Sequence, residues 1–469
     1  MIPVTLGATS RSKKVLHKSR HTTNNMRHCL SKCVVFSSIC IFLASPVIAN
    51  AGIPLPDFRR NVDYVEWLQD RVKCGANTSS VNAYSLFSQD PNGATLGSIK
   101  PSVSTDEYLD SLVLRPRAWG PNKFPNLSSY LVAIDKYIKV YSSVGGKGYC
   151  VDFGDNIEHV IEIELPYLQV SRIVSRSLIA AAWKQTGSSI DNTNFVKMMT
   201  ANLEHANYIQ QGLSFTEYST ASRIRDITYT SILAALEAGF LEKTDAQLLK
   251  ELLNNYDSSN LLEVLAEKLY FEPVGYFDLL QDMTRYSVLD PKFKKKRVAY
   301  WASLLGYFDS SASSSNGSRC IGEILSENPR NVAKKIDDYY AECRKLIFNG
   351  FDPNYNTAFA TLEKKYSDES RFFDIFPLMN LVKPYEMAFR LERKRRLTHL
   401  AINLLDYFYD NAAFTEACDA LRTIDLSILI DPITQDTFEI DFGKDEAYLN
   451  GPELGNFKKI EVKVHPRKR

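Results

Sequence analysis

Residues 224–269 read IRDITYTSILAALEAGFLEKTDAQLLKELLNNYDSSNLLEVLAEKL and decide the fold class. Apolar residues recur along this stretch at the three- and four-residue steps of a helix with one buried face. Gly239 interrupts the pattern first, and the polar run 254–260 interrupts it again. The three apolar stripes comprise Ile224, Ile227, Leu233, Leu236 and Phe240, then Leu248, Leu249, Leu252 and Leu253, then Leu261, Leu262, Leu265 and Leu269. Helices joined by such short breaks predict antiparallel helical hairpins.

The start of the second helix has its own signal. Thr244 and Gln247 have the spacing of a capping box, in which each side chain bonds a backbone N–H that the helix leaves without a partner. We therefore predict that this helix begins at Thr244. Leu236 lies within the first stripe and is predicted to face the core.

The helical pattern extends outward over most of the chain. We predict successive helices over 167–286 and further helices over 57–74, 127–141, 329–348, 356–366 and 385–409, with a short one after Thr415. Residues 75–105 are rich in Asn, Ser, Gly and Pro and are predicted to be a loop, and residues 309–318 a flexible loop. From 159 to 165 the pattern alternates, which fits either a short strand or an extended link.

Near the C-terminus the period changes to two. Phe438, Ile440 and Phe442 alternate with polar residues after Asp431-Pro432, and Ile460, Val462 and Val464 do the same. The predicted fold class is mainly α, a multi-helix antiparallel bundle or irregular helical array with a small C-terminal β-hairpin. We divide the chain into an export signal (1–51), an α-helical body (52–384), and C-terminal helices plus the hairpin (385–469).

Residues 1–51 have the features of a signal peptide. A basic stretch precedes an apolar run from Val34 to Ala44, and Ala49-Asn50-Ala51 is a small-x-small cleavage pattern that would leave Gly52 as the new N-terminus. Translation from Met1 and from Met26 both fit. We expect export to the periplasm or cell envelope, with an uncleaved leader that anchors the chain in the membrane as the alternative.

The net charge differs between the leader and the body. Seven of the 56 Lys and Arg lie in residues 1–51, and none of the 55 Asp and Glu does, so the rest of the chain has a net charge of −6. A mildly acidic body has no general attraction for nucleic acid. We therefore predict no nucleic-acid partner.

The cysteines beyond the leader are widely scattered. They are Cys74, Cys150, Cys320, Cys343 and Cys418, and no two have the Cys-x-x-Cys spacing of a zinc site. An oxidising compartment would permit disulfides. The sequence leaves their pairing open.

Catalytic and cofactor motifs are absent from the sequence. It has no Gly-x-Ser-x-Gly, no His-Glu-x-x-His and no phosphate loop, and Gly145–Gly148 is interpreted as a turn. His159, His205, His399 and His465 have no second ligand at a metal-binding spacing, so we predict surface or structural roles for them. We accordingly name no catalytic residue, no cofactor and no metal.

Two acidic groups are candidates for cation binding. Asp352, Asn354, Asn356 and Glu363 fall at the first, third, fifth and twelfth positions of a calcium loop, but Thr357 stands where that loop needs glycine. We interpret this segment as a turn into a helix capped by Asn356. The other group, Asp431, Asp436, Glu439 and Asp441, is interpreted as a solvated turn and strand face.

Two basic runs are candidates for contact with an acidic partner. They are Lys292, Lys294, Lys295, Lys296 and Arg297, and then Arg390, Arg393, Lys394, Arg395 and Arg396. We predict that the second run covers the solvated face of a helix, with contact to a membrane surface or an acidic partner through Arg390–Arg396 as the alternative.

The order of these features resembles that of a family of uncharacterised exported bacterial helical proteins. The resemblance covers most of 57–441 and lies in Asn82-Ala83, Leu86-Phe87, Pro125–Tyr137, Tyr167–Ala182, Leu203–Leu280 and Arg396–Asp441. The ending is also similar in layout to type II secretion pseudopilins, although Ile433, Thr434 and Gln435 replace the glycine and aromatic residues of that pattern. The resemblance implies export and a helical fold, and it implies no activity.

The leading functional hypothesis is a non-enzymatic helical module that binds a protein partner in the envelope. A hydrolase or ligand-binding protein whose site is assembled from scattered residues is the second hypothesis. A membrane-surface contact protein is the third.

Overall fold

The structure is a computed structural model. It describes residues 63–72, 100–142, 157, 159–160, 163, 165–186, 189–256, 260–286, 326–370, 372–376, 378–411, 421, 424–443 and 445–466. Helices form most of it, and a three-stranded antiparallel sheet lies near the C-terminus. The predicted fold class is confirmed.

Helices occur along most of the described chain. They are α2 (Tyr64–Val72), α4 (Val103–Leu114), α5 (Pro125–Ala133), α6 (Asp135–Ser142), α7 (Pro166–Ala182), α8 (Asn192–Gln210), α9 (Phe215–Ala238), α10 (Lys243–Tyr256), α11 (Leu261–Lys268), α12 (Pro273–Tyr286), α15 (Pro329–Phe348), α16 (Tyr355–Ser367), α17 (Phe372–Ile375), α18 (Val382–Asn411) and α20 (Leu426–Leu429). The antiparallel strands β1 (Gln185–Thr186) and β2 (Ser189–Ile190) connect α7 to α8.

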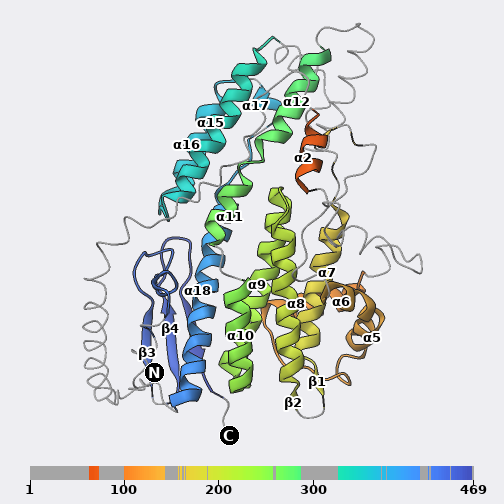
Figure 1. Ribbon diagram of the computed structural model, residues 1–469, viewed down its shortest axis with the longest axis vertical. Helices are drawn as coiled ribbons and strands as arrows, with labels where there is room; N and C mark the ends of the chain where they lie inside the picture. The colour runs from red at the N-terminus through yellow and green to blue at the C-terminus, as the bar shows by residue number, and fades with distance from the viewer. Residues whose placement is uncertain are drawn as a thin grey trace, which may run out of the picture.

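Two hydrophobic cores organise these helices. The first is formed by α4 to α10, the C-terminal two thirds of α18, and the sheet. The second is formed by α2, α11, α12, α15, α16, α17 and the first turns of α18. Figure 1 shows the first core in the lower part of the molecule and the second in the upper part. Because α18 contributes to both cores, it ties the two parts together.

Helix α9 is the central element of the first core. It packs against α7, α8, α18, α11, α4 and β5, so most of its circumference is buried. Buried Ser and Thr residues on α9 allow close packing, and some of their hydroxyls donate to carbonyls one turn earlier in the helix. For example, Thr228 Oγ1 donates to the carbonyl of Ile224 at 2.7 Å. A helix surrounded in this way is buried far beyond the single apolar face that the sequence showed.

Both ends of α9 are closed by local signals. Ser214 and Glu217 form a capping box, with each side chain bonding the other residue's backbone N–H. Gly212 precedes it closely, and a Cβ there would lie 2.2 Å from the Glu217 carboxylate. At the other end Gly239 is left-handed, with φ 64°, which glycine adopts without strain. These signals fix where α9 begins and ends.

The C-terminal sheet has three strands, whereas the sequence predicted a hairpin. β4 (Ala447–Gly451) lies between β3 (Glu439–Phe442) and β5 (Ile460–Val464). Ile440 pairs with Leu449, and Leu449 pairs with Val462, so one face of all three strands is apolar and buried. This face packs against α18 and α9.

Several predicted boundaries are corrected. Helix α4 begins at Val103, inside the predicted loop 75–105, after Ser102 caps it. The predicted helix 127–141 is split at Ile134 into α5 and α6. Helix α10 begins at Lys243, because the carboxylate of Asp245 accepts from the N–H of Glu242 at 2.8 Å and Thr244 is not the cap.

One residue of the predicted apolar stripes is exposed and not buried. Leu248 is 51% exposed, whereas Leu249, Leu252 and Leu253 on the same helix are buried. At 159–165 the described residues form no strand, and the N–H of Ile163 bonds the carbonyl of Val160 at 3.2 Å, which is a tight turn and not an extended link. The predicted flexible loop at 309–318 lies outside the described residues.

Candidate functional site

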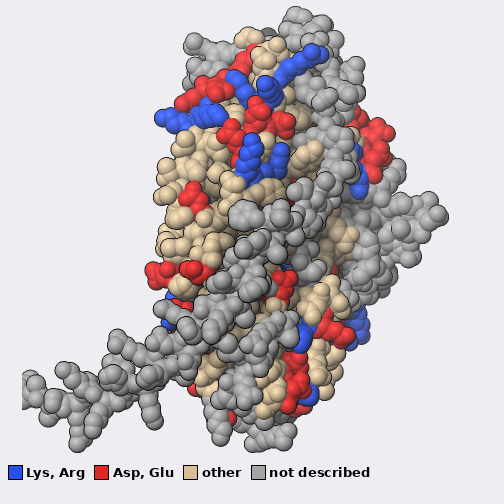
Figure 2. All heavy atoms as spheres, turned by 60° about the vertical axis from the view of Figure 1, so that its left-hand side comes forward, with Lys and Arg blue, Asp and Glu red and all other residues tan. Residues whose placement is uncertain are grey.

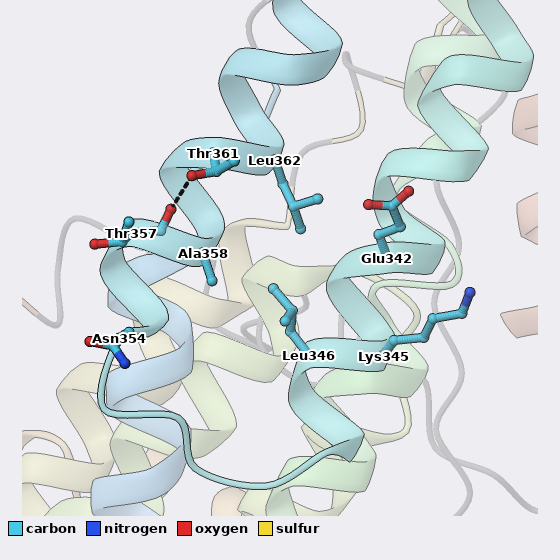
Figure 3. Close-up of a pocket in the computed structure, with 8 residues that line it drawn as sticks. All are labelled: Glu342, Lys345, Leu346, Asn354, Thr357, Ala358, Thr361 and Leu362. Atoms are coloured by element: carbon cyan, nitrogen blue, oxygen red, sulfur yellow. Dashed lines mark hydrogen bonds between the residues drawn. The ribbon is translucent and has the colours of Figure 1, made fainter.

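A solvent-facing groove of about 500 Å³ lies between α15 and α16. The inward faces of both helices carry aromatic residues, such as Tyr339 and Phe359, which pack into the second core. The outward faces leave Leu346, Ala358 and Leu362 at the base of the groove. In Figure 3 Leu346 and Leu362 point toward one another across the gap between the two helices. The groove is therefore an apolar surface held between two rigid helices.

Local signals position these two helices. Asn328 caps α15 through the N–H of Arg330 at 3.0 Å, and Pro329 occupies its first position. The turn into α16 contains Gly350 with φ 88° and Asp352, whose carboxylate accepts from the N–H of Asn354 at 2.8 Å. Across the helices, Glu342 bonds Lys365 at 2.9 Å and the hydroxyl of Tyr366 at 2.7 Å. The hydrogen bond and charge of Lys365 lower the pKa of Glu342.

Two of the polar side chains that line this groove, those of Glu342 and Thr361, already have partners within the chain. The hydroxyl of Thr361 donates to the carbonyl of Thr357 at 2.7 Å, so it makes no demand on a ligand. Lys345 is exposed, and among the described residues no carboxylate forms a salt bridge with it. Figure 2 shows this side of the molecule, with basic and acidic side chains interspersed in its upper part and mostly uncharged ones directly below them. The groove combines an apolar base with one available cation.

A second groove, of about 400 Å³, lies between α4, α7 and α9. Its lining is more polar than that of the first groove and includes Arg172, Arg176 and Arg223. The sequence search found neither groove, because each is made by residues from helices that only the tertiary fold brings together.

The second basic run is not a solvated face. The side chains of Arg393, Arg395 and Arg396 are 0%, 7% and 12% exposed. Lys394 is largely covered and contacts Asp226 and the hydroxyl of Thr230. Only Arg390 is more than half exposed. The interpretation of this run is therefore wrong, because α18 is buried between the two cores.

Arg393 and Asp431 form a fully buried ion pair, 2.6 Å apart, between α18 and the segment before the sheet. Arg393 also donates to the carbonyls of Pro452 and Lys458. Asp431 accepts from the N–H of Ile433 at 2.9 Å. A Cβ at Gly451 would lie 2.7 Å from the guanidinium, which explains the glycine there. The pair fastens the C-terminal sheet to α18.

A second buried cluster of charged side chains surrounds Glu392, the residue that precedes Arg393 on α18. Glu392 accepts from Arg395 at 2.8 Å and from Arg396 at 2.7 Å. Burial would raise the pKa of Glu392, but the hydrogen bonds and charges of these two arginines outweigh it and lower the pKa to about 2. The carboxylate of Glu392, on the same helix, therefore neutralises part of the positive charge of this basic run.

The two acidic groups behave differently from their interpretation. Asp431 is buried, so describing it as solvated is wrong, whereas Asp436, Glu439 and Asp441 are exposed. Asn354, not Asn356, is the residue before α16, so the predicted cap is also wrong. Among the described residues, no group of three or more His, Cys, Asp or Glu side chains is arranged to hold a metal ion.

His159 is held between two aspartates of α12. Its Nδ1 lies 3.3 Å from Asp278 Oδ2 and its Nε2 lies 3.7 Å from Asp282 Oδ2, and all three side chains are buried. Asp278 Oδ2 also accepts from the N–H of Val160 at 2.8 Å. With both ring nitrogens next to carboxylates, His159 anchors its segment to α12.

His205 is fully buried in the first core, stacked on Tyr141 with ring centroids 3.5 Å apart. Its Nε2 lies 3.0 Å from Ser171 Oγ, the distance of a nucleophile and its base. Burial lowers the pKa of His205 to about 3, however, so it is a weak base at neutral pH. Neither residue lines either groove, and the arrangement therefore favours a structural role.

The low pKa of His205 predicts a specific pH dependence of stability. The unfolded chain binds a proton at this residue below about pH 6.5, whereas the folded chain does not, so folding loses free energy as the pH falls. We expect the advantage of wild type over His205→Gln in unfolding free energy to shrink by about 2 kcal/mol between about pH 7.5 and pH 5. Urea titrations of both proteins measure it. A pH-independent difference would contradict this account.

The remaining candidates lie mostly outside the described residues. These include the run from Lys292 to Arg297, the turn Gly145–Gly148, and Cys74, Cys150, Cys320 and Cys418. Cys343 is a buried free thiol on α15, and burial raises its pKa to about 12. His399 is buried in α18, and His465 is partly covered.

No family model, no curated protein and no solved structure matches the chain. The resemblance to exported bacterial proteins therefore stays a prediction from the sequence. None of the described helices has the length and apolar character needed to cross a membrane.

Proposed function

We propose that this chain is an exported, non-enzymatic helical protein whose α15–α16 groove binds an amphipathic helix of a partner protein. The observation that carries the proposal is the groove itself, which opens to solvent above the half-buried side chains of Leu346, Ala358 and Leu362. Export rests on the sequence of residues 1–51 alone. The occupant is a helix because two packed helices present a furrow into which the side-chain ridge of a third helix fits.

The chemistry of the groove defines the partner helix. Aliphatic side chains at helical spacing would cover Leu346 and Leu362, and the small side chain of Ala358 permits close approach of a backbone. Lys345 at the rim favours a carboxylate on the flank of that helix.

The two alternatives have less support. Membrane contact through Arg390–Arg396 would need free cations, and Arg393, Arg395 and Arg396 are buried and engaged. A hydrolase would need an accessible nucleophile beside its base, and the Ser171–His205 pair is fully buried.

Capture and titration together test the proposal. A photo-reactive residue in place of Thr361, which is exposed and lines the groove, would cross-link the occupant in cells that produce the full chain. The captured segment would then be synthesised and titrated against the purified chain. We expect saturable binding and an increase in peptide helicity. A segment that binds without becoming helical, or the absence of any captured segment, would overturn the proposal.

Ala358→Arg is expected to weaken this binding by at least about tenfold, which corresponds to about 1.4 kcal/mol. The arginine side chain would fill the base of the groove and place a charge against Leu346 and Leu362. The matched control is Ala360→Arg, which makes the same change at an exposed residue of α16 outside the groove. Equal affinities for the two variants would mean that the helix binds elsewhere.

A further inference from the structure

The groove between α4, α7 and α9 has a charge opposite to that of the body. Four basic and two acidic side chains line it, giving a formal charge of +2, whereas the chain beyond residue 51 carries −6. A local excess of positive charge on an acidic protein raises the local concentration of anions. This groove lies in the first core, apart from the α15–α16 groove of the second.

The acidic side chains of the groove neutralise only part of its positive charge. Arg176 takes up both, because it lies 2.8 Å from Asp106 and 2.6 Å from Asp110. Arg223 lies 3.6 Å from Asp226, which it shares with Lys394. The available charge therefore comes from the other two cations.

Those two cations are Arg172 and Lys100. Arg172 is exposed and donates to the hydroxyl of Thr220 at 2.8 Å, which holds its side chain without neutralising it. Lys100 is exposed just before α4. Among the described residues, no carboxylate forms a salt bridge with either one. An arginine held in place with most of its N–H donors available suits a carboxylate or a phosphate.

The groove also has an apolar part. Val113 of α4 and Ile173 of α7 line it beneath the charged side chains, and a small part of each side chain, 6% and 7%, is accessible. A purely inorganic anion would leave this surface uncovered. A ligand with a short apolar group next to its charge would cover the surface and meet the cations at once.

We propose that this groove binds a small organic anion, with its carboxylate or phosphate held by Arg172 and Lys100 and its apolar group against Val113 and Ile173. Arg176 is a positioning residue, because its bonds to Asp106 and Asp110 join α7 to α4 and set the width of the groove. The site is independent of the helix-binding groove.

Calorimetric titration of the full chain with octanoate and with octyl phosphate tests the proposal. Inorganic phosphate and octanol serve as probes that each carry half of the recognised chemistry. We expect saturable binding at a single site for at least one amphiphilic anion, weakened by added salt, and much weaker binding of both half probes. The tighter of the two anions identifies the headgroup. No saturable binding, or octanol binding as well as the anions do, would overturn the proposal.

Variants locate the binding site. Arg172→Gln is expected to lower the affinity by at least about tenfold, because it removes the positioned guanidinium. Lys100→Gln is expected to lower it by about threefold, and as an exposed residue before α4 it leaves folding intact. Lys197→Gln removes the same charge from an exposed position on α8 and is expected to change the affinity less than about twofold. Equal effects of all three would mean that the anion responds only to net charge.

Discussion

Leu236→Asp is expected to leave the full chain without its helical fold. Leu236 is 0% exposed and lies on α9, which other helices and β5 surround. Truncating a buried leucine costs about 2–5 kcal/mol, and a carboxylate buried without a partner costs several more. Because folded proteins have a net unfolding free energy of about 5–15 kcal/mol, the sum of these two costs is comparable to the total stability of the fold. Far-ultraviolet circular dichroism and a thermal melt measure the loss.

Leu248→Asp is the matched control for this substitution. Leu248 is on the neighbouring helix α10 and is 51% exposed, so the same chemical change there meets water. We expect the unfolding free energy to change by less than about 0.5 kcal/mol. A melt of Leu236→Asp that coincides with that of Leu248→Asp would contradict the position of α9 at the centre of the core.

These two leucines show what a helical pattern predicts and what it does not. Periodicity placed both in predicted apolar stripes and correctly predicted that helices run through 224–269. It did not distinguish Leu248 from its buried neighbours, because the direction that a stripe faces depends on which elements pack around it. The capping box Ser214–Glu217 was visible as Ser-x-x-Glu and would have located the start of α9.

The C-terminal sheet was likewise predicted only in part from the sequence. Alternation predicted β3 and β5, whereas β4 between them was not predicted. Gly451 ends β4 and is small because Arg393 lies against it. That cause comes from a residue far away in the sequence, so no local pattern shows it.

The candidate site could not be predicted from the sequence, because it also depends on how distant segments pack together. Leu346 and Leu362 belong to helices whose positions were predicted well, at 329–348 and 356–366. What makes them a candidate site is the placement of α15 and α16, which leaves these half-buried side chains pointing toward one another across a groove (Figure 3). The cations of the second groove likewise come from segments far apart in the sequence, and Arg172 stands out only once its neighbours are known.

Asp431→Ala is expected to lower the unfolding free energy by about 3–5 kcal/mol. The substitution leaves Arg393 charged and fully buried, with only the carbonyls of Pro452 and Lys458 to accept its hydrogen bonds. It also removes the acceptor of the N–H of Ile433. Urea denaturation of the full chain measures the change, and we expect the β-sheet to lose its protection from hydrogen exchange before the helices of the second core do.

The double variant separates the ion pair from its neighbours. Arg393→Met alone is expected to be strongly destabilising, because it leaves Asp431 buried without its cation. Arg393→Met combined with Asp431→Ala is expected to cost less than the sum of the two single changes, since no uncompensated charge remains. Arg390→Ala is the control within the same run, because Arg390 is 57% exposed and lies 3.7 Å from Glu386, and it should cost less than about 1 kcal/mol. If the two single changes in unfolding free energy were additive, Arg393 and Asp431 would stabilise the fold separately. If Arg390→Ala lowered the unfolding free energy as much as Arg393→Met does, burial would not set the strength of this pair.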